Sequence, residues 1–225
     1  MKLSIIVPAL NEATGIIAAL QALAPFRSRG HEVIVVDGGS ADGTASLAAA
    51  LADRVIRAPR GRARQMNAGA EIAQGDAFLF LHADTRLPAQ AEQILLDALS
   101  GRSWGRFDVR IEGRSPLLRI VAFCMNWRSR VSGIATGDQA IFVRREAFTG
   151  AGGFPDIPLM EDVEMSTRLK RTSAPACLRA RVVTSGRRWE RHGVLRAIVL
   201  MWRLRLAYFL GARPEDLARR YANGA

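Results

Sequence analysis

The sequence SIIVPALNE occupies residues 4–12, and HEVIVVDGGSADGT occupies residues 31–44. In each stretch a run of apolar, mostly β-branched residues ends in a polar turn, which is typical of a buried strand followed by a loop. Residues 12–24 between them carry apolar positions at helical spacing. A strand, a helix and a second strand in this order predict the beginning of a parallel sheet. We expect Pro8 to end the first strand.

The alternation of strand and helix continues to residue 100 and then becomes irregular. Up to that point the pattern predicts strands at residues 53–58 and 77–81, and helices at 42–51, 62–73 and 88–100. Beyond it we expect strands at residues 107–111, 140–143 and 182–185, and helices at 117–127, 161–170 and 193–210. The fold class is therefore α/β, with a mostly parallel central sheet and helices on both faces.

Polar side chains follow the apolar strands at their carboxyl ends, which is where ligands bind in parallel sheets. Asn11 and Glu12 follow the first strand, Asp37 ends the second, and Asp84 follows the strand at 77–81. Asp84 offers a hard oxygen ligand that suits Mg²⁺ or Mn²⁺. His82 lies two residues earlier and points to the same side, so it is either a further ligand that favours Mn²⁺ or a structural histidine.

The net charge of +11 lies in the last quarter of the 225-residue chain. Residues 1–167 hold 18 basic and 18 acidic residues, whereas residues 168–220 hold 14 basic and 3 acidic ones. A basic region of this kind indicates nucleic acid, an anionic membrane surface or an anionic substrate, and a general preference for arginine explains it equally well.

Cys124 and Cys177 fit no metal or redox motif. Both lie among apolar neighbours, so we expect two buried thiols and a reducing compartment. The apolar run at the N-terminus is too short for a secretory signal, and no run approaches the ~20 residues of a membrane-spanning helix. These features predict a cytoplasmic protein, either free or peripheral at the inner face of the membrane.

Five motifs occur in the order found in the GT-A glycosyltransferases of family 2, and the chain resembles that family over roughly residues 3–192. They are the first strand with its Pro and Asn-Glu, the turn at 37–44, RARQMNAG at 62–69, HAD at 82–84, and GGF at 152–154 followed by ED at 161–162. The resemblance implies a GT-A fold, a nucleotide diphosphate sugar as donor and a divalent cation, Mn²⁺ or Mg²⁺, as cofactor.

The resemblance also assigns a role to each motif residue. Asp162 would be the catalytic base. The donor would be bound by Pro8, Asn11, Glu12, Asp37, Gly39, Arg62, Arg64 and Asn67. The metal would be bound by Asp84, with His82 and His192 as further candidates. The sugar or acceptor would contact Trp104, Asp138, Gln139 and Glu161. A segment that closes over the diphosphate would contain Arg187, Arg188 and Trp189.

We expect one domain over residues 1–225. About 1–100 would bind the nucleotide sugar, about 101–192 would bind the acceptor and perform catalysis, and about 193–225 would form basic and apolar helices. The chain departs from the family in two motifs: the family's Asp-Asp-Gly-Ser reads DGGS at 37–40, and its Asp-x-Asp reads HAD at 82–84. These departures leave the nucleotide base of the donor and the identity of the metal open. A UDP-sugar is the first expectation for the donor.

Four further motifs are similar to a bacterial subgroup described as radical-SAM/selenodomain-associated and linked to arsenosugar biosynthesis. They are WGRFD at 104–108, GDQ at 137–139, LMED at 159–162 and SGRRW at 185–189.

An acceptor hydroxyl must lose its proton as it attacks, and a positioned carboxylate supplies that base. Asp162 lies with Glu161 and Glu164 at the expected start of a helix, where acids also stabilise the helix dipole. One base and no separate nucleophile imply a single displacement with inversion at the sugar.

The acceptor is either a small molecule or lipid-linked, and nucleic acid is not expected. The helix at 193–210 is apolar almost all round and carries Arg196, Arg203 and Arg205. It either packs on the core, forms a homodimer face or lies in a membrane interface.

Two other functions remain open. A nucleotidyltransferase would share the sheet and the metal, but it would normally carry a glycine-rich loop with a lysine where this chain has residues 8–12. A non-catalytic nucleotide- or anion-binding module with a basic C-terminal surface lacks aromatic residues interleaved in the basic segment, and it does not explain the ordered acids.

Overall fold

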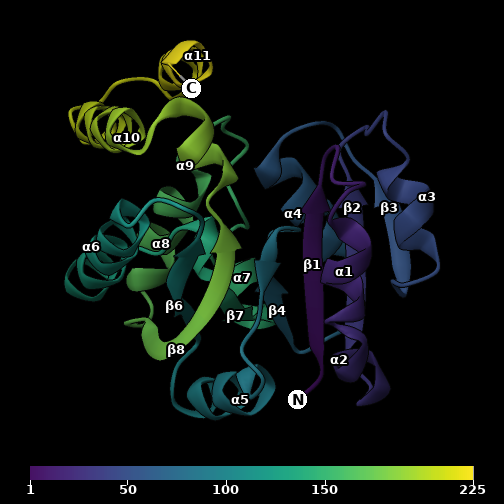
Figure 1. The fold of residues 1–225 in the computed structure, drawn as a ribbon. Helices are drawn as coiled ribbons and strands as arrows, with labels where there is room; N and C mark the ends of the chain where they lie inside the picture. The colour runs from purple at the N-terminus through teal and green to yellow at the C-terminus, as the bar shows by residue number, and fades with distance from the viewer. Residues whose placement is uncertain (225) are drawn as a thin grey trace.

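The structure, a computed structural model, describes residues 1–224, without the side chains of Arg188, His192 and Asn223. Its centre is a sheet of 8 strands in the order β3-β2-β1-β4-β7-β6-β8-β5 (Figure 1). The strands are β1 (Leu3–Ala9), β2 (Glu32–Asp37), β3 (Arg54–Arg57), β4 (Ala77–Phe80), β5 (Thr85–Arg86), β6 (Trp104–Glu112), β7 (Phe142–Arg144) and β8 (Ala176–Ser185). The predicted α/β class is confirmed.

The strands from the first hundred residues pair in parallel, as expected. β1 lies between β2 and β4, and β2 also pairs with β3. The later strands are mixed, because β7 is antiparallel to both β4 and β6, whereas β6 and β8 are parallel. The carboxyl ends of β1, β2 and β4 therefore meet at one edge of the sheet.

Pro8 does not end the first strand, which runs on to Ala9. The O atom of Ile6 accepts a hydrogen bond from Leu81 N, so Ile6 and Pro8 turn their backbone groups towards β4. β4 ends at Phe80, so the missing N–H of Pro8 leaves no ladder partner unsatisfied.

Helices cover both faces of the sheet. One face packs against α1 (Ile16–Gln21), α2 (Ala24–Ser28), α3 (Thr44–Ala49), α5 (Ala91–Gly101) and α6 (Leu117–Ser132). The other face packs against α4 (Arg62–Ile72), α7 (Arg145–Gly150) and α8 (Glu161–Lys170). Alternate residues of β1 point to opposite faces, Ile5 to the first and Ile6 to the second, as the two-residue period of a strand requires.

The C-terminal segment forms α9 (Arg187–His192), α10 (Val194–Phe209) and α11 (Pro214–Gly224). α10 and α11 lie together at one end of the molecule (Figure 1) and build a small apolar cluster of their own, in which Leu204 and Leu217 join Met160 and Val163. The C-terminal helices are thus packed directly onto the start of α8.

The two cysteines are free, and the expectation that both are buried is wrong: Cys177 is half-buried, and Cys124 is exposed. Its apolar neighbours on α6 include Phe123 and Trp127, which are 68% and 61% exposed. The apolar run there forms an outward face rather than core. Within residues 1–224, no helix combines the length and hydropathy needed to cross a bilayer.

Candidate active site

Two loops at the carboxyl edge of the sheet are tied together by Asn11. Its backbone N–H donates to Ser40 Oγ at 2.9 Å, and its side-chain Oδ1 accepts from Ala41 N at 3.0 Å. Asn11 has a φ of 55°, a left-handed conformation that asparagine tolerates better than most residues. The loop after β1 and the loop after β2 therefore form one unit.

Asp37 shapes the second of these loops. Its side chain is fully buried and accepts hydrogen bonds from Gly39 N at 3.1 Å and from Ser40 N. Gly39 has a φ of 92°, which only glycine adopts readily. The geometry shows Asp37 acting inside the turn, and its contact with a nucleotide stays a prediction.

Gln65 of α4 binds the carboxyl ends of β1 and β2, a role that the sequence did not predict. Its side-chain Nε2 donates to Ala9 O at 2.9 Å and to Val36 O at 2.8 Å, and the residue is 4% exposed. The available signal was a polar amide on the apolar face of the predicted helix 62–73. Gln65 therefore fixes the ends of β1 and β2 relative to α4.

The three predicted donor-binding residues of α4 have different surroundings. Arg64 is paired with Asp156 at 2.7 Å, and Asn67 exchanges two hydrogen bonds with the backbone of Phe154. Both link α4 to the second half of the chain. Arg62 instead faces acids: desolvation lowers its pKa, but nearby carboxylates, that of Glu161 above all, raise the pKa above its ordinary value.

Asp84, Glu12 and Arg187 converge from three distant parts of the chain. Arg187 Nη2, at the start of α9, lies 3.2 Å from Glu12 Oε2 and 4.0 Å from Asp84 Oδ2. Figure 1 shows α9 at the edge where the β-strands of the first half end. The structure thus brings a predicted metal ligand and a predicted diphosphate-closing residue together, although their roles stay predictions.

Two acids begin α8. Asp162 Oδ2 accepts a hydrogen bond from Gly137 N at 3.0 Å, and Oδ1 accepts from Val163 N at 2.7 Å. The neighbouring Glu161 is 5% exposed, and burial together with the charge of Asp162 raises its pKa to about 7. The favourable charges of Arg62 and His82 offset only part of that increase. Asp162 is the more accessible of the two carboxylates.

His82, in the loop that follows β4, contacts the short 3₁₀ helix Gly137–Gln139. Its Nδ1 lies 3.3 Å from Asp138 Oδ1. A Cβ at Gly137 would lie 2.6 Å from His82 Nε2, so both ring nitrogens face protein atoms. Gln139 is fully buried and accepts a hydrogen bond from Thr136 N, which closes the turn. Asp138 thus remains the accessible side chain of this motif.

Trp104 does not lie in the site, contrary to the prediction that it contacts the sugar or acceptor. It is fully buried, and its Nε1 donates to Ser173 O at 2.7 Å. It begins β6, which runs in the same direction as β4, so it lies at the edge opposite Asp84. Trp189 is half-buried against the core, and the side chains of Arg188 and His192 lie outside the described part of the structure.

The donor atoms around Asp84 suit a cation that is shared with a substrate. Among the residues that the structure describes, no group of three or more His, Cys, Asp or Glu side chains could enclose a metal ion. Asp84 is 31% exposed and presents one carboxylate. Mg²⁺ is commonly held by one or two carboxylates together with substrate phosphates. The residues therefore fit a cation completed by a diphosphate.

Two arginines that the sequence analysis did not assign to the site lie near Asp162. They are Arg128 of α6 and Arg205 of α10, and both are within electrostatic range of its carboxylate. Burial and the charge of Arg205 lower the pKa of Arg128 to about 10. No local motif marks these residues, because only the packing of two distant helices brings them together.

Comparison with known sequences assigns the chain to a family. A sequence model described as "Glycosyl transferase family 2" matches residues 4–130. A curated relative, the PGL/p-HBAD biosynthesis glycosyltransferase of Mycobacterium bovis (strain BCG / Pasteur 1173P2), is 37% identical over 91 residues, which cover 37% of this chain and 36% of the relative. The chain thus matches about a third of the length of that relative.

Solved structures share the fold. The mannosyltransferase PcManGT from Pyrobaculum calidifontis, in complex with GDP-Man and Mn²⁺, superimposes with a TM-score of 0.68 at 21% identity, over 98% of this chain and 69% of that one. S. aureus TarS 1–349, in complex with UDP-GlcNAc, gives a TM-score of 0.65 at 19% identity, over 82% and 58%. The predicted GT-A fold is therefore confirmed. Since the family match spans more than half of the residues, from β1 to within α6, the protein belongs to glycosyl transferase family 2.

Proposed function

We propose that this protein transfers a glycosyl group from a nucleoside diphosphate sugar to an acceptor hydroxyl. The observation that carries the proposal is the arrangement of Asp84 and Arg187 at the carboxyl ends of the strands, with the Glu161-Asp162 pair at the start of α8 facing Arg62. A leaving diphosphate needs positive charge, and an attacking hydroxyl needs a base.

In this proposal Asp162 accepts the proton of the acceptor hydroxyl. Its two backbone hydrogen bonds fix the direction of the carboxylate. Arg187 and Arg62 would bind the diphosphate and neutralise its charge as it leaves. A divalent cation at Asp84, Mn²⁺ or Mg²⁺, would stabilise the same charge. Direct attack by the hydroxyl inverts the anomeric configuration, so a product that retained the configuration of the donor would contradict this scheme.

The nucleotide of the donor is a separate question from the catalytic base. PcManGT is in complex with GDP-Man, and TarS is in complex with UDP-GlcNAc, so related folds accept both purine and pyrimidine nucleotides. The resemblance in sequence favours UDP, which we propose as the donor nucleotide. The subgroup motifs support acceptors of the arsenosugar type, which parallel assays of hydroxyl acceptors with and without an arsenic-bearing group would test.

The test is thermal stabilisation by UDP and GDP, with and without Mn²⁺. A nucleotide at 100 times its dissociation constant stabilises a protein by about 2.7 kcal/mol. We expect a Mn²⁺-dependent shift that Asp84→Asn abolishes. Asp97→Asn is the matched control, because Asp97 lies on α5 and its side chain accepts a hydrogen bond from Gln93 on the same helix. No shift in the folded wild type would exclude donor binding and favour the binding-module alternative.

The outer faces of α6 and α10 support peripheral contact with an anionic membrane. Each helix has 16 residues and contains no Asp or Glu. Each carries exposed arginines beside an exposed apolar face, which on both helices includes a tryptophan. The exposed apolar residues are Ile120, Phe123, Trp127 and Val131 on α6, and Leu195, Val199, Trp202, Leu206 and Phe209 on α10. Apolar side chains bordered by arginine are the features of an interfacial helix.

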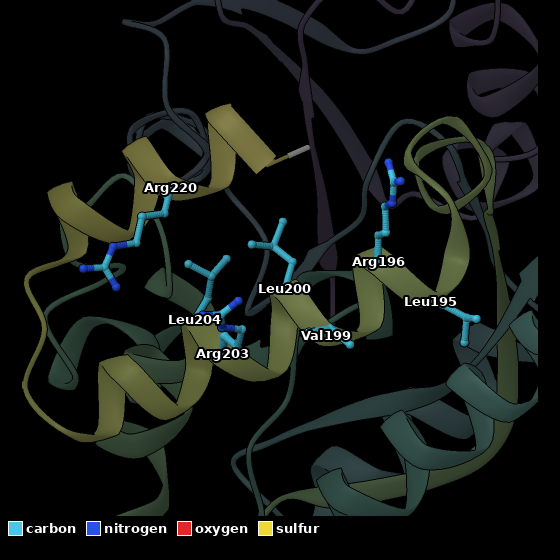
Figure 2. A pocket seen from close by; sticks show the side chains of 7 residues that line it. All are labelled: Leu195, Arg196, Val199, Leu200, Arg203, Leu204 and Arg220. Carbon is cyan, nitrogen blue, oxygen red and sulfur yellow. The ribbon is translucent and has the colours of Figure 1, made fainter.

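A groove of about 640 Å³ adjoins this face between α10 and α11. Figure 2 shows its lining, with leucine and valine side chains of α10 beside Arg196 and Arg203, and Arg220 on α11. The combination suits a lipid chain with an anionic headgroup. We therefore propose that the protein works at the cytoplasmic membrane surface, where a lipid-linked acceptor would be presented.

Sedimentation with vesicles tests this contact. We expect binding to phosphatidylglycerol vesicles, weaker binding to phosphatidylcholine, and loss of binding in a Trp127→Ser/Trp202→Ser variant. Leu47→Ser is the control, because Leu47 is an exposed apolar residue on α3, away from this face. If the double variant instead converted a dimer into a monomer and left vesicle binding unchanged, the face would be a homodimer interface.

A further inference from the structure

Arg128 of α6 and Arg205 of α10 are half-buried, but each has enclosed polar atoms that lack a partner among the described residues. Nε and Nη2 of Arg128 and Nε of Arg205 are enclosed, and no hydrogen-bond acceptor contacts them in the part of the chain that the structure describes. The fully buried Arg106 differs, because it bonds to Asp108, to Ser129 Oγ and to the backbone of Asn126. Buried polar groups are almost always paired, so unpaired ones require an explanation.

The fold holds these two arginines beside the proposed base. Leu204 is 2% exposed and packs with Met160 and Val163, on either side of the Glu161-Asp162 pair. The next residue on α10, Arg205, lies within electrostatic range of both Asp162 and Asp138. Arg128 is within range of Asp162 and of Arg205 itself. Two like charges are therefore held close together, and Asp162 is within range of both.

This pair is separate from the arginine at the donor end. Arg187 contacts Glu12 and Asp84, which follow β1 and β4. Arg128 and Arg205 instead come from α6 and α10 of the second half. A diphosphate bound at Asp84 would account for Arg187. It would not account for Arg128 and Arg205, whose anionic neighbours within electrostatic range, among the described residues, are carboxylates of the protein.

We propose that Arg128 and Arg205 bind an anionic group of the acceptor, a phosphate or a carboxylate, and so place the neighbouring hydroxyl at Asp162. The inference rests on the proposed glycosyl transfer, and it specifies the acceptor class. Guanidinium groups donate paired hydrogen bonds to the oxygens of such anions. An anion between them satisfies the buried N–H groups and removes the repulsion between two cations.

The first test measures binding of inorganic phosphate and of glycerol 3-phosphate, with glycerol as the uncharged comparison. Both anions should raise the melting temperature of the wild type, and glycerol should not. Arg205→Met should weaken the apparent affinity for both anions about tenfold or more, since charge-assisted hydrogen bonds are lost. Arg171→Met is the control, because it removes one exposed arginine at the far end of α8.

A second readout distinguishes a ligand site from a structural pair. Replacing Arg205 with an apolar side chain of similar length removes the repulsion between two neighbouring cations. Without anions, Arg205→Met should therefore melt no lower than the wild type, while its response to phosphate is lost. A variant that melts lower and still responds to phosphate as the wild type does would overturn the proposal.

The same variants separate this inference from the proposed function. Binding of UDP or GDP with Mn²⁺ should be unchanged in Arg128→Met and Arg205→Met. Weaker nucleotide binding would assign the pair to the donor and overturn the acceptor role. If the wild type bound phosphate through the pair but bound no nucleotide, glycosyl transfer would fail and the anion site would stand.

Vesicles identify the source of the anion. A response to glycerol 3-phosphate that requires Arg205 indicates an acceptor in solution. Loss of binding to phosphatidylglycerol vesicles in Arg205→Met, with no response to the soluble ester, indicates a lipid headgroup. A wild type that responds to neither would exclude an anion site at this position.

Discussion

The two halves of the molecule fix their polar groups by different means. In the first half, side chains close the loops at the site by bonding to the backbone: Gln65 bonds to β1 and β2, Asn11 bonds across to the next loop, and Asp37 bonds within its own turn. In the second half, charged side chains are buried, as in Arg106 with Asp108. The first half therefore depends on close packing, whereas the second depends on charge balance, and each should respond to a different kind of substitution.

The largest effect is expected at the proposed base. Asp162→Asn keeps the shape and the hydrogen-bond acceptor for Gly137 N but removes the basic carboxylate. We expect the rate of sugar transfer to fall by about 10²–10⁴-fold with nucleotide binding unchanged, as measured by product release and thermal shift. Glu164→Gln is the control on the same helix, since Glu164 pairs with Arg168. Activity within tenfold of the wild type in Asp162→Asn would assign the base elsewhere.

A substitution that disturbs packing in the first half should lower the free energy of unfolding rather than the rate of sugar transfer. At Gly69 an added Cβ would lie 2.5 Å from Ile6 Cγ2 and 3.0 Å from Val36 Cγ2, because α4 packs closely onto β1 and β2. We expect Gly69→Ala to lower the free energy of unfolding by about 1–3 kcal/mol in urea denaturation. Gly15→Ala, where the added atom meets nothing within 4 Å, should have little effect. Equal effects of the two substitutions would contradict the close-packing argument.

The boundary between the halves can be tested at α4. Asn67 donates to Phe154 O at 2.7 Å and accepts from Phe154 N at 2.9 Å, whereas Arg64 joins Asp156 in solvent. We expect Asn67→Ala to cost about 1–2 kcal/mol of unfolding free energy, since two hydrogen bonds are lost. Arg64→Gln should leave stability unchanged within error. The reverse order would show that the exposed ion pair joins the halves.

The pH dependence of stability that arises from Glu161 tests the charge balance of the second half. Its pKa is raised from 4.5 to about 7 in the folded protein, so the folded state binds a proton there that the unfolded chain has released. Stability from this group is therefore present below about pH 4.5 and declines as the pH rises towards 7, by at most about 1.4 kcal/mol per pH unit. Glu161→Gln should flatten the curve of unfolding free energy against pH. An unchanged slope in this variant would show that Glu161 titrates normally.

The predictability of the fold follows the same division. Strands β1, β2 and β4 are fully or almost fully buried, so they appear in the sequence as continuous apolar runs. β8 was predicted only in its last residues, because arginines at 179 and 181 interrupt its pattern where the strand is exposed. β5 has two residues, Thr85 and Arg86, and depends wholly on pairing with β8. Local pattern determines the first half, and pairing between distant segments determines the second.

The site divides similarly. Asp84 and Asp162 were found because each follows a motif, and the structure brings Asp84 to Arg187 and Asp162 to Gly137. The prediction for Trp104 was wrong because its sequence neighbours do not reveal that β6 begins at the opposite edge of the sheet. Arg128 and Arg205 were missed because their common surroundings exist only after α6 and α10 have packed. Sequence motifs therefore identified the donor side of the site better than its other side.

The place of β8 in the sheet also sets an order of assembly. β8 lies between β6 and β5, so a strand from residues 176–185 completes a sheet whose other members come earlier in the chain. Thr184 of β8 accepts a hydrogen bond from Thr85, the residue after Asp84. Arg187, which lies just after β8 in the chain, pairs with Glu12. During synthesis the N-terminal part of a chain leaves the ribosome first, and domains generally fold as units. A nascent chain therefore has a complete set of site residues only after β8 and α9 have left the ribosome.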